Sequence, residues 1–298
     1  KMTPYRDSED GDVSASTSQK QNFCIALRTG TTYNLYGLGV VSGTGKAEVL
    51  MKSLSTGASN DLDDNGWATP SNNQSSSGST SFNLFVYYQR TGLIYGARAG
   101  THIWAFDPSS AVAWADTSQA LTYTNIAQGL VHSADRVLYV PYDNKIASKN
   151  GSGAWNTTAL TLPDNMYITS ICEHGNYLAI ACAPLSGSGS SRVFLWDRDS
   201  SSEFLSESIL WGEEVLQVIE EVDGVLVGIS YSGLNGTRFS DRIIFRYVSV
   251  SNAVKFAELQ GTTSSILRLA KQKLDNRVYF MMSVTITAAV REGVWSVG

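Results

Sequence analysis

The stretch "NDLDDNGWATP", residues 60–70, contains the residue types that bind a hard cation. Asp61, Asp63, Asn65 and Gly66 occupy the first, third, fifth and sixth positions of the pattern D-x-[DN]-x-[DN]-G. Carboxylate and amide oxygens at these intervals can wrap calcium, and the glycine permits the sharp turn that the loop needs. Asp61, Asp63 and Asn65 are therefore the candidate metal ligands of this chain.

The anionic ligands that would complete such a calcium loop are missing. An EF-hand needs an acidic residue at position twelve, where this chain has Asn72. A propeller-type calcium loop needs a carboxylate at position nine, where this chain has Thr69. The triplet "DNG", residues 64–66, favours the positive φ angles of a tight reversal. We therefore expect a polar turn that leads into Trp67, with no cofactor, and keep calcium as the weaker alternative.

A second loop supports a structural interpretation of the first. The segment "KNGSGAWNTT", residues 149–158, also delivers a tryptophan that is followed two residues later by threonine, but it carries no acidic residue. The carboxylates of the first loop are therefore not needed to form the turn. Trp67 and Trp155 are candidate surface-binding aromatics, because exposed rings can stack on sugars; the alternative is packing in the core.

Catalytic patterns are absent from the sequence. His102, His132 and His174 are far apart, with no H-x-H or H-x-x-x-H spacing, so we expect them on surfaces or in turns. No nucleophile elbow, P-loop or dinucleotide-binding motif occurs, and no local motif selects a pair of carboxylates for glycoside hydrolysis. The sequence therefore predicts no catalytic residues and a protein that is not an enzyme.

Composition narrows the classes of partner. The chain has 298 residues, a formal net charge of −5 and only 16% charged residues, so Ser, Thr, Asn and Gly supply much of its polar surface. No cluster of Lys and Arg suits phosphate neutralisation, which argues against nucleic acid as a partner. No apolar run approaches the roughly 20 residues of a membrane-spanning helix, so we expect no membrane insertion.

Two of the three cysteines flank a predicted hairpin turn, "EHGN". With His174 and Gly175 at the tip of that turn, Cys172 would lie opposite Tyr177 and Cys182 opposite Tyr167. The two sulfurs would then be too far apart to form a disulfide. We expect both cysteines to be small core residues.

Short runs rich in Val, Ile, Leu, Tyr and Phe recur along the chain between Gly, Ser, Asn and Asp. Runs such as "NYLAIAC" and "RVLYVPY" are apolar throughout, as expected of buried central strands; "FCIAL" and "LFVYY" have the same pattern. Four segments repeat a strand, a polar turn and a more apolar strand, and a third strand follows each. This degenerate repeat of about 40 to 60 residues is typical of propeller blades. Six units begin near Gln21, Ser81, Ile126, Tyr167, Val215 and Ile266.

The repeat predicts an all-β fold, a β-propeller of about six, or seven, antiparallel blades. The last unit stops after its third strand, "VWSVG", so its blade is either incomplete or borrows a strand from the other terminus. Residues 1–20 would form an N-terminal arm or that closing strand, and residues 21–298 the propeller. Alternatively, the chain continues beyond Gly298. A pair of β-sandwiches or a β-helix would be the competing folds.

Three segments carry a resemblance to a known group of proteins. "MTPYRDSEDGD" (residues 2–12), "ALRTGTTYNLYGLGVV" (residues 26–41) and the closing "VWSVG" resemble propeller-like segments of tailed-phage and phage-metagenome structural proteins. The resemblance covers most of the chain, and it carries no functional residues across. It implies a virion location, in a tail, tail tip or hub, and contacts with other virion proteins. A homo-oligomeric ring and a host-surface glycan are further partners that it implies.

The leading functional hypothesis is therefore a non-enzymatic structural component of a phage virion, acting through protein–protein contacts and host-surface binding. The alternatives are a carbohydrate-binding, lectin-like propeller and a glycoside hydrolase. An aromatic on the top face of each blade would favour the lectin, and two carboxylates about 5 to 10 Å apart in a central pocket would favour the hydrolase.

Overall fold

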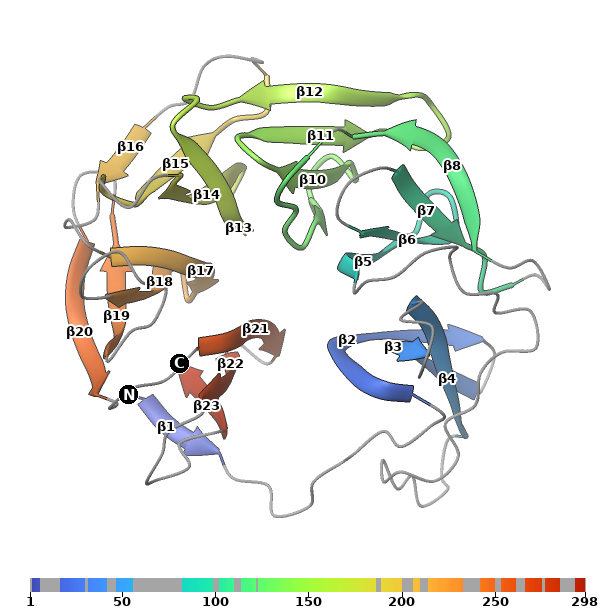
Figure 1. Ribbon diagram of the computed structural model, residues 1–298, viewed down its shortest axis with the longest axis horizontal. Coiled ribbons are helices and arrows are strands. Elements are labelled where there is room, and N and C mark those ends of the chain that lie inside the picture. Colours follow the sequence, from blue (N-terminus) through green and yellow to red (C-terminus); the bar gives the residue numbers. More distant parts are fainter. Residues whose placement is uncertain are drawn as a thin grey trace. The chain divides into compact units, whose positions relative to one another are not determined.

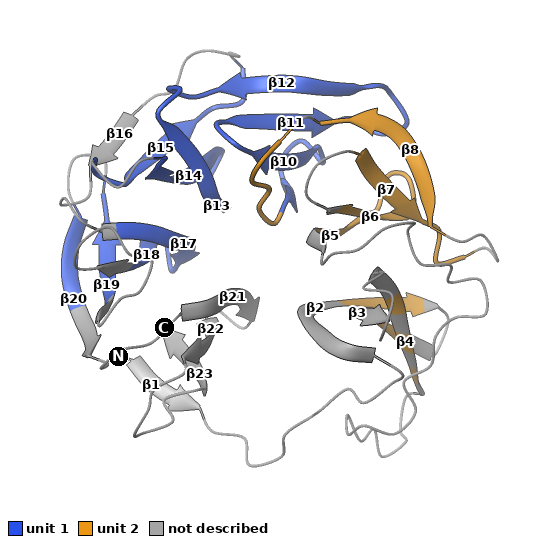
Figure 2. Cartoon of the chain, viewed as in Figure 1, with its two compact units in different colours: residues 1–6, 129–298 blue, residues 7–128 orange. Residues whose placement is uncertain are grey.

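The computed structural model describes the backbone of residues 2–5, 17–29, 32–41, 47–55, 82–98, 102–109, 114–121, 123–185, 189–199, 206–209, 214–232, 242–249, 253–260, 266–274, 277–284 and 293–297. These residues form strands, turns and bends and contain no helix, which confirms the all-β prediction (Figure 1). The chain divides into two compact units, one of residues 1–6 with 129–298 and one of residues 7–128 (Figure 2).

The unit of residues 7–128 contains two antiparallel sheets whose strands pair in the order of the sequence. The first sheet has three described strands, β2 (Thr17–Thr29), β3 (Thr32–Val41) and β4 (Ala47–Ser55). The second has four, β5 (Phe82–Tyr88), β6 (Leu93–Arg98), β7 (His102–Phe106) and β8 (Ala115–Ala120).

The larger unit contains four sheets of four strands each. In the first three, the strands pair in the order of the sequence. One sheet contains β9 (Leu130–Val131), β10 (Leu138–Tyr142), β11 (Lys145–Lys149) and β12 (Trp155–Thr161), and the next contains β13 (Met166–His174), β14 (Tyr177–Pro184), β15 (Arg192–Trp196) and β16 (Ser206–Ile209). The third contains β17 (Glu214–Val222), β18 (Val225–Ser232), β19 (Arg242–Val248) and β20 (Ala253–Gln260). All six sheets of the described chain begin within a few residues of the repeat units that the sequence predicts.

The fourth sheet of this unit combines both ends of the chain. Its strands are β21 (Ile266–Leu274), β22 (Arg277–Val284), β23 (Gly293–Val297) and β1 (Met2–Tyr5), in the order β1-β23-β22-β21. β1 pairs antiparallel with β23, with Met2 opposite Val297 and Tyr5 opposite Val294. The last sheet therefore borrows its fourth strand from the N-terminal segment, as one of the two predicted alternatives requires.

Tight turns set the register of the hairpins. β17 and β18 are joined by Asp223 and Gly224, with φ angles of 49° and 79°, and Val222 pairs with Val225. Two residues at positive φ match the right-handed twist of the flanking strands, which is why Asp-Gly is favoured there. The β13–β14 hairpin has the same length, and its Gly175 has a φ of 58°.

The prediction of where the β13–β14 turn lies was wrong by one residue. The tip is Gly175–Asn176, and His174 pairs with Tyr177. Cys172 therefore lies opposite Ala179, and a bulge further along places Cys182 opposite Ile168. Cys172 and Cys182 are both buried, as expected of core residues.

The central strand β14 is apolar on both sides because its sheet packs on both of its faces. In β14, the residues from Leu178 to Ala183 are all buried. On one face of the sheet, Leu178 and Ile180 share a core cluster with Tyr139 and Leu160. On the other face, Ala179 and Ala181 share a core cluster with residues of β17 and β18. The sequence patterns of "NYLAIAC" and "RVLYVPY" thus report burial correctly.

Apolar composition did not distinguish central from edge strands. β2 and β5 contain the runs "FCIAL" and "LFVYY" but lie at sheet edges. At the β5 edge, the Gln128 side chain replaces a neighbouring strand. Its amide accepts a hydrogen bond from the Phe85 N–H at 3.0 Å and donates to the Phe85 carbonyl at 2.7 Å. An edge strand can therefore be as apolar as a central one when other groups cover it.

Candidate functional site

The candidate site lies in the larger unit, where the β9–β10 connection, the β13–β14 hairpin and the segment after β15 meet. Arg198, two residues beyond β15, joins all three. Its Nη1 donates to Asp135 Oδ2 at 2.5 Å and its Nη2 to the Asn176 carbonyl at 2.8 Å. The Arg198 backbone is left-handed, with a φ of 75°. A non-glycine residue at positive φ is uncommon, and here it accompanies the placement of the guanidinium between two connections.

His132 lies at the start of the β9–β10 turn, one of the two predicted positions, and is fully buried beneath this arginine. Its Nδ1 lies 3.0 Å from Arg198 Nη1 and accepts the Ala134 N–H at 3.2 Å. Because both neighbours are donors, Nδ1 must be the unprotonated nitrogen. The proton is then on Nε2, which donates to the Tyr177 carbonyl at 3.3 Å. The neutral imidazole thereby connects the β9–β10 connection to the β13–β14 hairpin.

Two carboxylates, Glu173 and Asp135, hold the same loops. Glu173 accepts hydrogen bonds from the backbone N–H and the hydroxyl of Ser133, both at 2.6 Å. Asp135 accepts from the Tyr139 hydroxyl at 2.9 Å as well as from Arg198. Burial, together with the hydrogen bond to the Asp135 carboxylate, raises the pKa of Tyr139 far above its usual value. The hydroxyl therefore stays protonated and donates to Asp135.

The tip of the β13–β14 hairpin carries two side chains on one side of its sheet. His174 and Tyr177 lie directly opposite each other in the ladder, so both side chains project to the same side. That side faces β17 and β18, because Cys172 and Ala179 pack there. The His174 Nδ1 lies 2.7 Å from Glu221 Oε2 of β17, and Tyr177 is 38% exposed.

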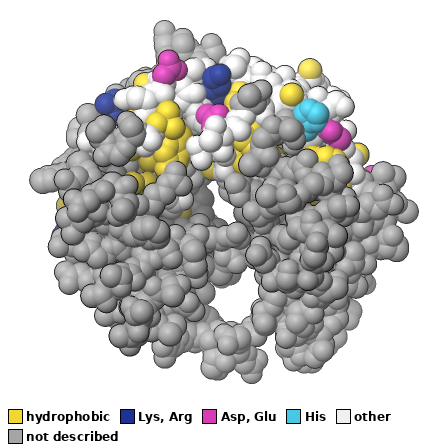
Figure 3. Space-filling view, in the orientation of Figure 1, with side chains coloured by type: hydrophobic (Ala, Val, Ile, Leu, Met, Phe, Trp, Pro, Cys, Tyr) yellow, Lys and Arg dark blue, Asp and Glu magenta, His cyan; other side chains and the backbone are white. Residues whose placement is uncertain are grey.

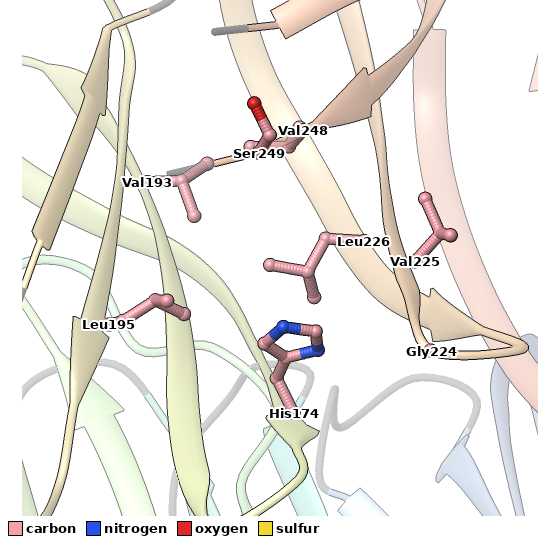
Figure 4. Close-up of a pocket in the computed structure, with 8 residues that line it drawn as sticks. All are labelled: His174, Val193, Leu195, Gly224, Val225, Leu226, Val248 and Ser249. Atoms are coloured by element: carbon pink, nitrogen blue, oxygen red, sulfur yellow. The ribbon is translucent and has the colours of Figure 1, made fainter. Parts of the chain in front are cut away.

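An open pocket of about 270 Å³ adjoins His174. It is lined by His174, Val193, Leu195, Gly224, Val225, Leu226, Val248 and Ser249. Figure 4 shows the His174 ring pointing towards Leu226, with Val193 and Leu195 on one side and Val225 on the other. The walls are mainly aliphatic, and Val225 at the β17–β18 turn is 44% exposed. This combination of an apolar pocket and a few polar groups is typical of small-ligand sites.

The sequence predicted other residues as site candidates, and the structure describes only one of them. Trp155 begins β12 and is half-buried, with the Lys149 Nζ 5.5 Å from the centre of its ring. Lys149 also donates to the Gly153 carbonyl at 2.7 Å, and burial lowers its pKa. Asp61, Asp63, Asn65 and Trp67 lie outside the described residues.

Within the described residues, no group of three His, Cys, Asp or Glu side chains is placed to hold a metal ion. The same part of the chain has no helix long and apolar enough to cross a membrane. On the face that Figure 3 shows, the few Lys and Arg side chains drawn stand apart from one another, and one of them lies beside an acidic side chain.

His102 of β7 forms an ion-pair geometry like that of His174, with its Nδ1 2.7 Å from Asp116 Oδ2 of β8. The histidines thus lie in separate repeat units, and two of them each have a carboxylate partner. Local sequence spacing gave no sign of these partners, because Asp116 and Glu221 are 14 and 47 residues away.

No protein-family model matches this chain, and no curated protein matches it. Solved structures do resemble it. The β-propeller domain of Myceliophteria thermophila Cps50 (Swd1) is 10% identical, with a TM-score of 0.51, over 91% of this chain and 88% of that one. The extracellular domain of a putative one component system from B. thetaiotaomicron is 10% identical, with a TM-score of 0.56, over 91% and 32%. Trypanosoma rangeli sialidase is 11% identical, with a TM-score of 0.52, over 99% and 57%.

The class of protein follows from the sheets and from these similarities. Repeated antiparallel meanders of four strands, with the last closed by the N-terminal segment, are the architecture of a β-propeller. The chain spans about a third of the second similar structure and a little over half of the third. At identities of about a tenth, the similarity establishes the fold, and function has to be argued from the site.

Proposed function

We propose that this propeller is a carbohydrate-binding module that recognises a neutral glycan at the tip of the β13–β14 hairpin. The observation that carries the proposal is the placement of Tyr177 and His174. They lie opposite each other on one side of the sheet, and His174 lines the pocket. An exposed aromatic ring offers a flat apolar surface for the C–H face of a sugar, and nearby polar groups give direction to its hydroxyls.

The rigidity of the hairpin supports a binding role. Arg198 holds the Asn176 carbonyl, His132 holds the Tyr177 carbonyl, and Ser133 holds Glu173. These bonds fix the hairpin before a ligand arrives, so little conformational entropy is lost when the ligand binds. A loop ordered in this way suits a preformed recognition surface.

Charge at the tip favours a neutral ligand. The carboxylate of Glu221 lies beside His174, and Asp223 lies in the neighbouring β17–β18 turn. The guanidinium of Arg198 is already engaged by Asp135 and the Asn176 carbonyl. An anionic sugar would therefore meet carboxylates without a dedicated cation, whereas hydroxyl groups can donate to them.

The same contacts favour binding over hydrolysis. Glycoside hydrolysis needs two carboxyl groups that flank the scissile bond, one of them protonated. Here Asp135, Glu173 and Glu221 each hold a side chain or backbone partner across a structural contact. A sugar-binding role also agrees with one solved structure of similar fold, a Trypanosoma rangeli sialidase in complex with sialic acid.

Binding of immobilised and free oligosaccharides tests the proposal. A panel of neutral and acidic glycans would be screened with the whole chain, and hits would be measured by titration calorimetry. Tyr177→Ala should weaken binding about tenfold or more, the scale of losing an aromatic contact. The matched control is Tyr247→Ala, since Tyr247 is 41% exposed on β19 and stacks on Phe256. If no glycan binds, the proposal is refuted. If only Tyr247→Ala loses glycan affinity, the binding site lies at Tyr247 and not at Tyr177.

The virion role stays a prediction. A neutral glycan site would serve host-surface binding, which the resemblance to phage structural proteins implies. The predicted contacts with other virion proteins, the homo-oligomeric ring and the virion location are separate proposals. Co-purification of this chain with virion particles would test them.

A further inference from the structure

The pocket beside His174 has two chemically different parts. Val193, Leu226 and Val248 are buried and supply aliphatic walls, and Leu195 and Val225 extend these walls to the opening. The polar side chains of the lining are those of Ser249 and His174, and the His174 ring points inward, towards Leu226 (Figure 4). The ligand group that fills this pocket must therefore be mostly apolar and must carry one polar atom in reach of the imidazole.

The hydrogen bond to Glu221 determines what His174 offers. Nδ1 lies 2.7 Å from Glu221 Oε2, and a carboxylate only accepts, so Nδ1 carries a proton. In the neutral imidazole, Nε2 is then an acceptor, at the end of the ring that points into the pocket. A ligand that fits this pocket therefore donates a hydrogen bond to His174 and places apolar atoms against the aliphatic walls.

We propose that this pocket takes the acetamido group of a neutral N-acetylated hexosamine, an inference that rests on the proposed glycan-binding function. The amide N–H donates to the His174 Nε2, and the methyl group packs against the aliphatic walls. The cavity of about 270 Å³ is several times the roughly 30 Å³ of a water-sized group, so it also admits part of the sugar ring. Tyr177, on the same side of the sheet, is placed to cover another part of the glycan.

The lining disfavours the other substituents of common sugars. The described residues that line the pocket include no Lys or Arg to pair with a carboxylate, and the nearby carboxylate of Glu221 is already engaged by His174 Nδ1. Transfer of an unpaired charge into such surroundings is costly. A hydroxyl group alone could donate to His174, but it would leave the aliphatic walls facing polar atoms or water.

Three β-1,4-linked trisaccharides with the same backbone test the inference, namely those of N-acetylglucosamine, glucosamine and glucose. Titration calorimetry with the whole chain should show the acetylated trisaccharide binding at least roughly tenfold more tightly than the other two. If all three bind equally, the acetamido inference is wrong while glycan binding stands. If none of these or any other glycan binds, the proposed function itself fails.

Two variants locate the subsite. His174→Phe removes the hydrogen-bond acceptor Nε2. Leu195→Phe places a larger side chain at a partly buried residue of the lining and so narrows the pocket. Each should abolish the preference for the acetylated trisaccharide, with thermal melting to show that the fold persists. The matched control is His102→Phe, which removes a histidine with the same 2.7 Å carboxylate contact in another sheet. An unchanged preference in His174→Phe, or an equal loss in His102→Phe, would overturn the assignment.

Discussion

The guanidinium of Arg198 lies 3.0 Å from Nδ1 of His132, and the contact joins two residues from neighbouring sheets that are 66 positions apart. Their proximity requires the imidazole to be neutral, with its proton on Nε2. The hairpin that carries Tyr177 and His174 depends on this pair, because Nε2 of His132 and Nη2 of Arg198 each bind one of its carbonyls.

Removal of the arginine should loosen this arrangement. Arg198→Ala would leave Asp135 without its cationic partner and the Asn176 carbonyl without the guanidinium donor, and we expect a loss of about 2–3 kcal/mol in the free energy of unfolding. Arg198→Lys keeps the charge but not the planar fork, so it should recover only part of that loss. Urea unfolding measures both variants. Full recovery by lysine would show that charge alone matters.

The decrease in the free energy of unfolding at alkaline pH should depend on Tyr139. Its pKa is raised in the folded state, so above about pH 10 the unfolded chain releases this proton while the folded chain retains it. Stability is therefore fully present below that pH and falls as pH rises, by up to about 1.4 kcal/mol per pH unit for this one group. Tyr139→Phe should make the fall less steep, as measured by urea unfolding between pH 9 and 11.

The same variant has a second expected effect at neutral pH. The Tyr139 hydroxyl donates to Asp135, so its removal should cost about 1 kcal/mol. Burial also raises the pKa values of Tyr36, Tyr95 and Tyr142, so Tyr139→Phe should leave part of the alkaline fall in place. An unchanged alkaline slope would contradict the role of Tyr139.

The buried cysteines should resist modification. Burial raises the pKa of the Cys182 thiol, and both Cys172 and Cys182 are enclosed by the core. Because the thiolate is the reactive form, iodoacetamide should label neither residue in the folded protein and both in urea. Mass spectrometry of the peptides identifies the labelled sites. Rapid labelling of either cysteine in the folded state would contradict its burial.

Two tryptophans should differ in their contribution to stability. Trp196 is among the largest fully buried side chains and meets Tyr139 edge-on at 5.7 Å between ring centres. Trp196→Ala should lower the free energy of unfolding by about 3–5 kcal/mol. Trp155 is half-buried beside Lys149, so Trp155→Ala should lower it by only about 1 kcal/mol. Chemical unfolding compares the two. Equal losses would mean that Trp155 is a core residue and not a candidate binding aromatic.

The sequence predicted the repeat better than the site. Apolar runs and polar turns report burial and reversal locally, so the six units and the closing strand could be expected from residues such as Gly224. The exact turn at Gly175 could not, because "EHGN" allows neighbouring registers and packing selects one of them. The pocket escaped prediction because His174 and Val248 come together only when two sheets pack, and no local spacing records that contact.

The most direct test of the glycan site measures ligand contact at the residues that line the pocket. Methyl NMR of the unmodified chain, titrated with the N-acetylglucosamine trisaccharide, should shift the methyl signals of Val193, Leu195, Val225, Leu226 and Val248. Signals of Leu84 and Ile103, buried in other sheets, should stay in place. Saturable shifts confined to the pocket methyls are the predicted result. No shifts, or shifts centred on Val254 beside Tyr247, would contradict a glycan site at the β13–β14 hairpin.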